Sequence, residues 1–91
     1  MKINSDYIVI LDEDKISLYG KDYPDDENDM YEFHDRAFNI LKLIHEKQLD
    51  TNHLTFEMCK IYPDDSIIKI IADTIDLLEA FERGKIIDHL D

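Results

Sequence analysis

Carboxylates are the side chains of this sequence whose spacing could support chemistry most directly. They cluster at residues 12–14 and 25–29, and they recur on a predicted helix as Asp73, Asp76 and Glu79. Carboxylates at such spacing bind cations or the Lys and Arg side chains of a partner. A calcium loop would carry glycine at its sixth position and glutamate at its twelfth, and neither acidic segment does. We therefore expect these groups to contact a basic protein, and we expect no bound metal.

The histidines do not change that expectation. His34 and His45 would share one helical face, but eleven residues place them about 16 Å apart along the axis, too far to hold one ion. A site built from His53, His89 and Cys59 would depend on tertiary proximity that the sequence does not indicate. We predict no metal ligands.

Motifs for catalysis are also missing from the sequence. It contains no nucleophile elbow, no phosphate-binding loop and no dinucleotide fingerprint. Gly20 and Gly84 are its only glycines, which leaves little material for a loop that closely approaches phosphate. We predict no catalytic residues, no cofactor and no enzymatic activity.

The elements that position the carboxylates begin with a predicted hairpin. Residues 7–11 read Tyr-Ile-Val-Ile-Leu, an apolar run rich in β-formers, and an acidic turn follows at residues 12–14. Residues 15–19 alternate polar and apolar side chains until Gly20. A two-stranded hairpin is marginally stable alone, so it must pack against helices or gain a further strand.

Two long amphipathic helices are predicted after the hairpin. The first covers about Asp26–Lys47, where apolar residues recur every three or four positions. The second covers about Asp65–Arg83 and ends at Gly84, a residue typical of the C-terminal cap. Residues 51–62 fit a short helix or a strand, and the possible N-caps before them favour the helix.

Residues 85–90, Lys-Ile-Ile-Asp-His-Leu, could return as a strand against the hairpin and complete a small antiparallel sheet. We therefore predict a single α+β domain spanning residues 1–91. The order helix, short helix, helix and strand also occurs in winged-helix modules, which is an alternative architecture based on pattern alone.

Composition limits the partners. The 91 residues include 22 acidic and 10 basic side chains, a formal charge of −12, and 44% hydrophobic residues are enough for a folded core. Residues 1–30 carry 9 acids and 3 bases, and residues 61–91 carry 8 and 3. Such a surface repels nucleic acid and anionic lipid. With one cysteine, no signal sequence and no membrane-spanning run, we expect a cytoplasmic protein that binds neither nucleic acid directly nor membranes.

The leading hypothesis is a small acidic protein-binding domain that inhibits a basic, nucleic-acid-binding protein. In composition the chain is like DNA-mimic inhibitors and like immunity proteins of nuclease toxins, and no motif assigns it to either. The alternative is a self-associating structural or adaptor subunit, which would form a homodimer and in which the acidic residues serve solubility alone. The predicted partner-binding residues are Asp25, Asp26, Glu27, Asp29, Tyr31, Phe38, Asp73, Asp76 and Glu79.

Overall fold

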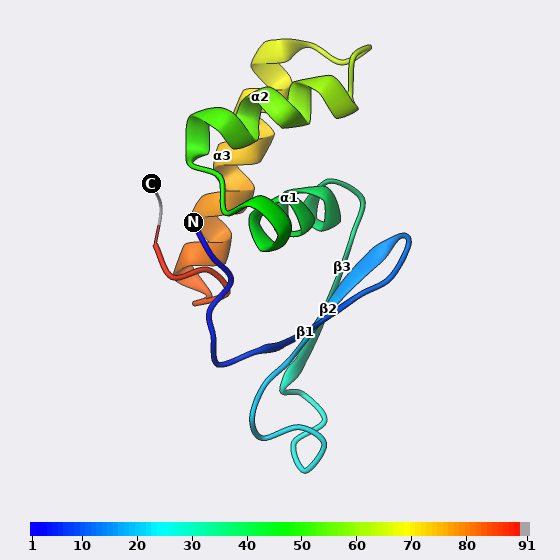
Figure 1. Cartoon of the computed structure of the whole chain (residues 1–91), viewed down its shortest axis with the longest axis vertical. Coiled ribbons are helices and arrows are strands. Elements are labelled where there is room, and N and C mark those ends of the chain that lie inside the picture. The colour runs from blue at the N-terminus through cyan, green and yellow to red at the C-terminus, as the bar shows by residue number, and fades with distance from the viewer. Residues whose placement is uncertain (90–91) are drawn as a thin grey trace.

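The chain folds into an antiparallel sheet followed by three helices (Figure 1). A computed structural model describes residues 1–89. The α+β class predicted from the sequence is confirmed. The elements are β1 Ile8–Leu11, β2 Lys15–Tyr19, β3 Met30–His34, α1 Asp35–Lys47, α2 Thr51–Ile61 and α3 Ile67–Arg83.

The predicted hairpin is confirmed as β1 and β2. Its strands are antiparallel, with Val9 opposite Leu18 and Leu11 opposite Ile16. The turn closes where the Asp12 amide donates to the Lys15 carbonyl at 2.9 Å. Ile16 and Leu18 are fully buried, so this set of alternate residues faces the helices.

The predicted long helix over Asp26–Lys47 is wrong in its first part. Residues 30–34 form β3, which pairs antiparallel with β2 and makes the sheet three-stranded in the order β1-β2-β3. Pairing with β2 satisfies backbone groups of a segment whose Tyr and Phe residues also favour a strand. The helix α1 starts only at Asp35, whose φ of 55° marks an abrupt change of direction.

The short helix favoured for residues 51–62 is confirmed as α2. Asp50 is its N-cap, and the Asp50 carboxylate accepts hydrogen bonds from the His53 backbone amide at 2.8 Å and the His53 ring at 2.7 Å. Both hydrogen bonds hold the pKa of Asp50 below its ordinary value, and the bond from the His53 backbone amide has the larger effect.

The lowered pKa of Asp50 leads to a prediction about acid stability. The folded state holds the Asp50 carboxylate ionised. Its contribution to the free energy of unfolding is therefore complete above the unfolded-state pKa of about 4, and it is lost as the pH falls through the lower pKa of the folded state. Asp50→Asn keeps a capping oxygen without the titration. Urea unfolding at pH 7 and pH 3 should show a smaller loss of stability in Asp50→Asn than in the wild type. An equal loss in both proteins would contradict the assignment.

The helix predicted over about Asp65–Arg83 is confirmed as α3, and it ends at Gly84 as expected. The left-handed residue at this end is Lys85, with a φ of 58°, whereas Gly84 has a φ of −80°. The predicted C-terminal strand is wrong for residues 85–89. Within the described residues this segment makes one isolated bridge, Ile3 to Ile87, and the Asn4 amide donates to the Ile86 carbonyl at 2.8 Å. Leu90 lies outside the described residues.

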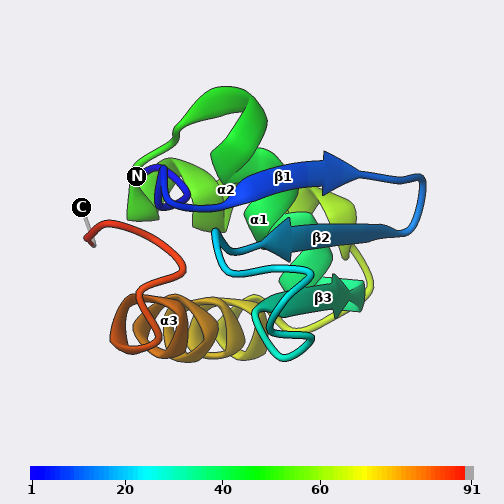
Figure 2. The ribbon, with the colours of Figure 1, turned by 90° about the horizontal axis from the view of Figure 1, so that it is seen from below.

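The core lies between the sheet and the helices. Ile16 and Leu18 of β2 meet Ile40, Leu41 and Ile44 of α1, all fully buried. Helix α2 packs against α3, and α3 runs beside β3 at the open side of the sheet (Figure 2). No helix within residues 1–89 is long and apolar enough to cross a membrane.

Candidate functional site

Strand β3 is an edge strand, and its outer side is open. The Gly20 amide donates to the Asp29 carbonyl at 2.8 Å, which makes residues 20 and 29 a hydrogen-bonded pair. Because such pairs alternate in an antiparallel ladder, Tyr31 and Phe33 bond to β2. The backbone groups of Met30, Glu32 and His34 then point away from the sheet. No strand of residues 1–89 pairs with that side.

A row of aromatic rings lies beside this edge, on the sheet face that carries the core. Tyr7 and Tyr31 meet edge to face at 6.0 Å between ring centroids, and Tyr31 and Phe33 stack at 6.4 Å. Phe33 then meets Phe81 of α3 at 5.4 Å. Phe81 is buried, but 41% of Tyr31 is exposed. The row therefore joins β3 to α3 and leaves one large ring accessible at the edge.

The flank of α3 that faces β3 follows from helix geometry. At 100° per residue, Leu77 and Ala80 fall on the same side as Asp73 and Phe81, which contact α1 and β3 respectively. Leu77 is half-buried and Ala80 is exposed. The flank of α3 on the side of β3 therefore carries a half-buried leucine and an exposed alanine.

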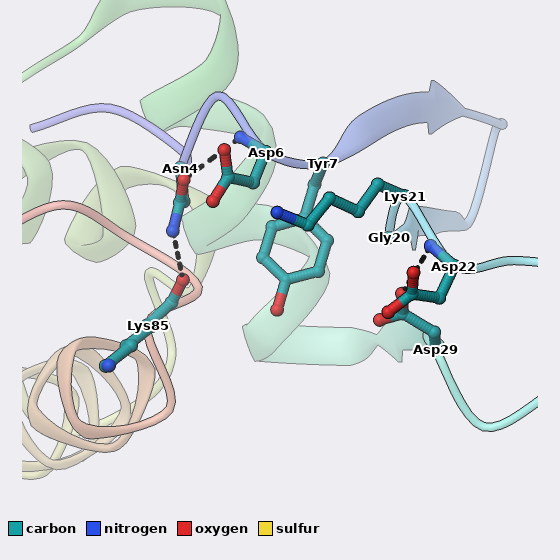
Figure 3. Close-up of a pocket in the computed structure, with 8 residues that line it drawn as sticks. All are labelled: Asn4, Asp6, Tyr7, Gly20, Lys21, Asp22, Asp29 and Lys85. Carbon is teal, nitrogen blue, oxygen red and sulfur yellow. Dashed lines mark hydrogen bonds between the residues drawn. The ribbon is translucent and has the colours of Figure 1, made fainter. Parts of the chain in front are cut away.

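A pocket of about 220 Å³ opens near the first residue of β3 (Figure 3). It lies between the N-terminal segment, the β2–β3 loop and Lys85, the second residue after α3. The Asp22 amide donates to the Asp29 carboxylate at 2.9 Å and holds that group at the rim. The lining residues are Asn4, Asp6, Tyr7, Gly20, Lys21, Asp22, Asp29 and Lys85.

Tyr7 links the pocket to the aromatic row. Burial raises the pKa of its phenol above the ordinary value, and the nearby Tyr31 and Asp29 raise it further. The hydroxyl of Tyr7 therefore stays protonated through neutral and mildly alkaline pH. It provides a neutral hydrogen-bonding group beside the Asp29 carboxylate.

Arg36 fixes the position of α3 relative to the sheet. Its guanidinium bonds to the carboxylates of Asp65 and Asp73, the latter at 3.1 Å, and it lies 4.6 Å from the centre of the Tyr62 ring. Arg36 is the second residue of α1, directly after β3. One side chain thus ties the end of β3 to the start of α3.

Arg36→Met should therefore loosen α3. The variant keeps most of the aliphatic stem but removes both ion pairs, whose carboxylates are more than one-third exposed and partly screened. We expect a loss of about 1–2 kcal/mol in the free energy of unfolding, measured by urea denaturation. Lys60→Met, which removes an exposed pair with Glu57, is the matched control and should cost less than about 0.5 kcal/mol. Equal effects would show that Arg36 has no such role.

The partner-binding residues predicted from the sequence fall in several places. Asp25, Asp26 and Glu27 are exposed in the β2–β3 loop, and Asp76 and Glu79 are exposed on α3. Their roles stay predictions.

The other predicted residues have defined neighbours. Asp29 and Tyr31 come together at the start of β3, next to the pocket. Asp73 is engaged by Arg36. Phe38 is only 7% exposed and belongs to the core, so its side chain is covered in this structure.

Sequence reasoning missed the residues that build this edge, namely Tyr7, Phe33, Phe81 and the outward backbone of β3. The alternation of residues 30–34, Met-Tyr-Glu-Phe-His, was the available signal for the strand. No comparable signal links Tyr7, Phe33 and Phe81, which come from three distant segments. Over residues 1–89, no group of three or more His, Cys, Asp or Glu side chains is placed to hold a metal ion.

The molecule is thus a small α+β domain in which an open sheet edge, an aromatic row and a helix flank lie together. The same fold is found in a solved structure of TbiB1 in complex with the TbiA(beta) leader peptide. The two chains superpose with a TM-score of 0.81 over 100% of this chain and 99% of the other, at 15% sequence identity. No protein-family model matches the chain, and no curated protein matches it. At this identity the likeness establishes the fold.

Proposed function

We propose that this chain is a peptide-binding domain that takes up a leader peptide as an added strand along β3. The observation that carries the proposal is the outward backbone of Met30, Glu32 and His34, unpaired by any described strand, beside an accessible aromatic ring. The likeness to TbiB1, solved with a leader peptide, supports it.

Strand addition explains how such an edge would bind a peptide without a deep pocket. Main-chain hydrogen bonds to the edge give affinity, and alternate side chains of the added strand give specificity. Side chains pointing to the core face of the sheet would meet Tyr31, Phe33 and Leu77. The opposite set would lie on the outer face of the sheet, next to Met30 and Glu32.

The charge beside the edge favours a particular kind of peptide. A strand paired with β3 passes the pocket at Asp29, whose lining combines the carboxylates of Asp6, Asp22 and Asp29 with the ammonium groups of Lys21 and Lys85 and keeps an excess of one negative charge. Peptides with Lys or Arg at the matching position should therefore bind more tightly. Their affinity should fall as salt screens these exposed charges. The chain binds and presents the peptide, and we assign it no catalytic step.

Amide hydrogen exchange tests the proposal. The probes are synthetic peptides covering the N-terminal halves of short open reading frames encoded next to this gene, together with the TbiA(beta) leader peptide. Titration into ¹⁵N-labelled protein should slow exchange of the Met30, Glu32 and His34 amides and leave the outward amides of β1 unchanged. If no probe protects these three amides, or if protection appears on β1, the proposed function is wrong.

A second candidate function is inhibition of a basic, nucleic-acid-binding protein. It is favoured by the carboxylates of residues 22–27, none of which forms an ion pair with a Lys or Arg of residues 1–89. Charge reversal at Asp25, Asp26 and Glu27 would slow association with such a target and remove its salt dependence. Peptide binding at β3 should be largely insensitive to the same changes, which separates the two functions.

A further inference from the structure

The outer face of the sheet, on the side away from the helices (Figure 2), carries exposed apolar side chains on β1. The register places Ile8 opposite Tyr19 and Ile10 opposite Ser17, on the face opposite the buried Ile16 and Leu18. Ile8 is 66% exposed and Ile10 is 46% exposed. One would expect polar residues at these positions if the face only met water.

A shallow depression lies on this face, beside β1 and the end of β2. It has a volume of about 410 Å³ and is lined by Ile8, Ile10, Tyr19, Gly20 and Tyr23. The Tyr19 and Tyr23 rings lie 4.8 Å apart and form one wall. Grouped exposed apolar side chains of this kind are typical of a surface that another molecule covers. We call Ile8, Ile10, Tyr19 and Tyr23 the outer patch.

Acidic segments flank the outer patch at both ends of the strands. The β1–β2 turn, residues 12–14, lies at one end, and the β2–β3 loop with residues 22–27 lies at the other. In the part of the chain that the structure describes, Lys and Arg make ion pairs with Glu32, Glu57, Asp65 and Asp73, and with none of these flanking acids. Lys15 and Lys21 lie next to these two segments, where three and four acidic residues outnumber them, so the outer patch is an apolar surface between two ends of net negative charge.

The other exposed apolar surface, between α2 and α3, lacks this arrangement. It includes Phe56, Ile67, Ile71 and Ile75, and the Lys60 ammonium lies 4.6 Å from the centre of the Phe56 ring. A cation at its rim makes its charge mixed. Charge therefore distinguishes the two apolar surfaces and selects the outer patch for a basic partner.

We propose that the outer patch docks a basic protein whose contact surface has an apolar centre with Lys or Arg at both ends. A second copy of this chain would bring acidic ends against acidic ends, at a net charge of −12 per chain, and is disfavoured. The outer patch lies on β1, β2 and the following loop, whereas the proposed peptide edge is β3. The domain could therefore hold a peptide and a basic protein together, and this second surface does not depend on the first.

A synthetic helical probe tests the outer patch. The probe has about 18 residues, ~27 Å as a helix, with Leu and Ile along the middle of one face and three lysines at each end. Isothermal titration should detect binding to the wild-type chain and at least a tenfold weaker affinity for the Ile8→Ser/Ile10→Ser variant. Phe56→Ser/Ile67→Ser changes the other apolar surface and is the matched control, for which we expect unchanged affinity.

Two further measurements keep the proposal distinct from its alternatives. Asp12→Lys/Asp14→Lys should weaken probe binding at low salt and have little effect at high salt. Amide protection of β3 by peptide should be the same in Ile8→Ser/Ile10→Ser as in the wild type, so failure here does not affect the peptide site. Equal probe affinity for the wild type and Ile8→Ser/Ile10→Ser would overturn the proposal. So would a wild-type dimer that the same variant dissociates in sedimentation, because the occupant would then be a second copy.

Discussion

Glu32→Pro should weaken peptide binding roughly tenfold while leaving the domain folded. The Glu32 amide points to the open side of β3, so proline removes a donor that only an added strand would use. One lost hydrogen bond, together with a peptide carbonyl left unpaired, costs about 1–3 kcal/mol, which corresponds to roughly a 5- to 160-fold loss of affinity. Isothermal titration with a peptide that protects the β3 amides measures the effect, and circular dichroism with thermal unfolding monitors the fold.

Two variants isolate the backbone contribution. Glu32→Ala removes the same side chain and its ion pair with Lys15 but keeps the amide, so the difference between Ala and Pro reports the hydrogen bond alone. Leu11→Pro removes an amide that points outward from β1, the opposite edge of the sheet, and should leave peptide affinity unchanged. If Glu32→Ala and Glu32→Pro bind the peptide equally, strand addition at β3 is ruled out as the mode of binding.

The way β3 escaped prediction shows where sequence patterns stop being informative. Met30, Phe33 and Ala37 follow one another at spacings of three and four, so the helical pattern begins five residues before the helix itself, which starts at Asp35. Residues 31–34, Tyr-Glu-Phe-His, also alternate apolar and polar side chains, as a strand would. Periodicity cannot choose between these interpretations for five residues. Pairing with β2 makes this segment a strand, and that pairing is a tertiary interaction that the local sequence does not show.

The strand predicted for residues 85–90 was wrong over residues 85–89, because adjacent apolar residues there are buried without forming a sheet. Ile86 and Ile87 are adjacent and both buried, so this segment does not have the alternating buried and solvent-exposed side chains of an edge strand. It is covered by the N-terminal residues through a few backbone hydrogen bonds, such as Asp88 amide to Lys2 carbonyl at 3.1 Å. By contrast, α2 and α3 were predictable because caps and long apolar stripes are local signals.

Only the acidic character of the candidate site could be predicted from the sequence. The acidic excess is visible in the sequence and pointed to Asp29, whereas Tyr31 was predicted as an aromatic contact residue on a helix that proved to be a strand there. The open edge is a property of sheet order, and the aromatic row depends on bringing Tyr7, Phe33 and Phe81 together. Neither is encoded by spacing along the chain.

Phe81→Ala should be the most destabilising of the substitutions considered, because Phe81 joins the two halves of the domain. It is 5% exposed and packs its ring against Phe33 of β3. Removing a buried phenyl ring costs about 3–5 kcal/mol, a large part of the ~5–15 kcal/mol that stabilises a typical domain. Urea unfolding followed by circular dichroism should show this loss as a lower midpoint.

Phe56→Ala is the matched control for Phe81→Ala, since it deletes the same ring from a side chain that is 62% exposed. We expect a change within about 0.5 kcal/mol. The more conservative Phe81→Leu keeps the site apolar and should recover much of the stability, which allows peptide affinity to be measured on a folded protein. Reduced peptide affinity in folded Phe81→Leu would show that the contact between α3 and β3 holds the binding edge in place. Unchanged affinity would mean that β3 alone defines the site, with α3 contributing only to stability.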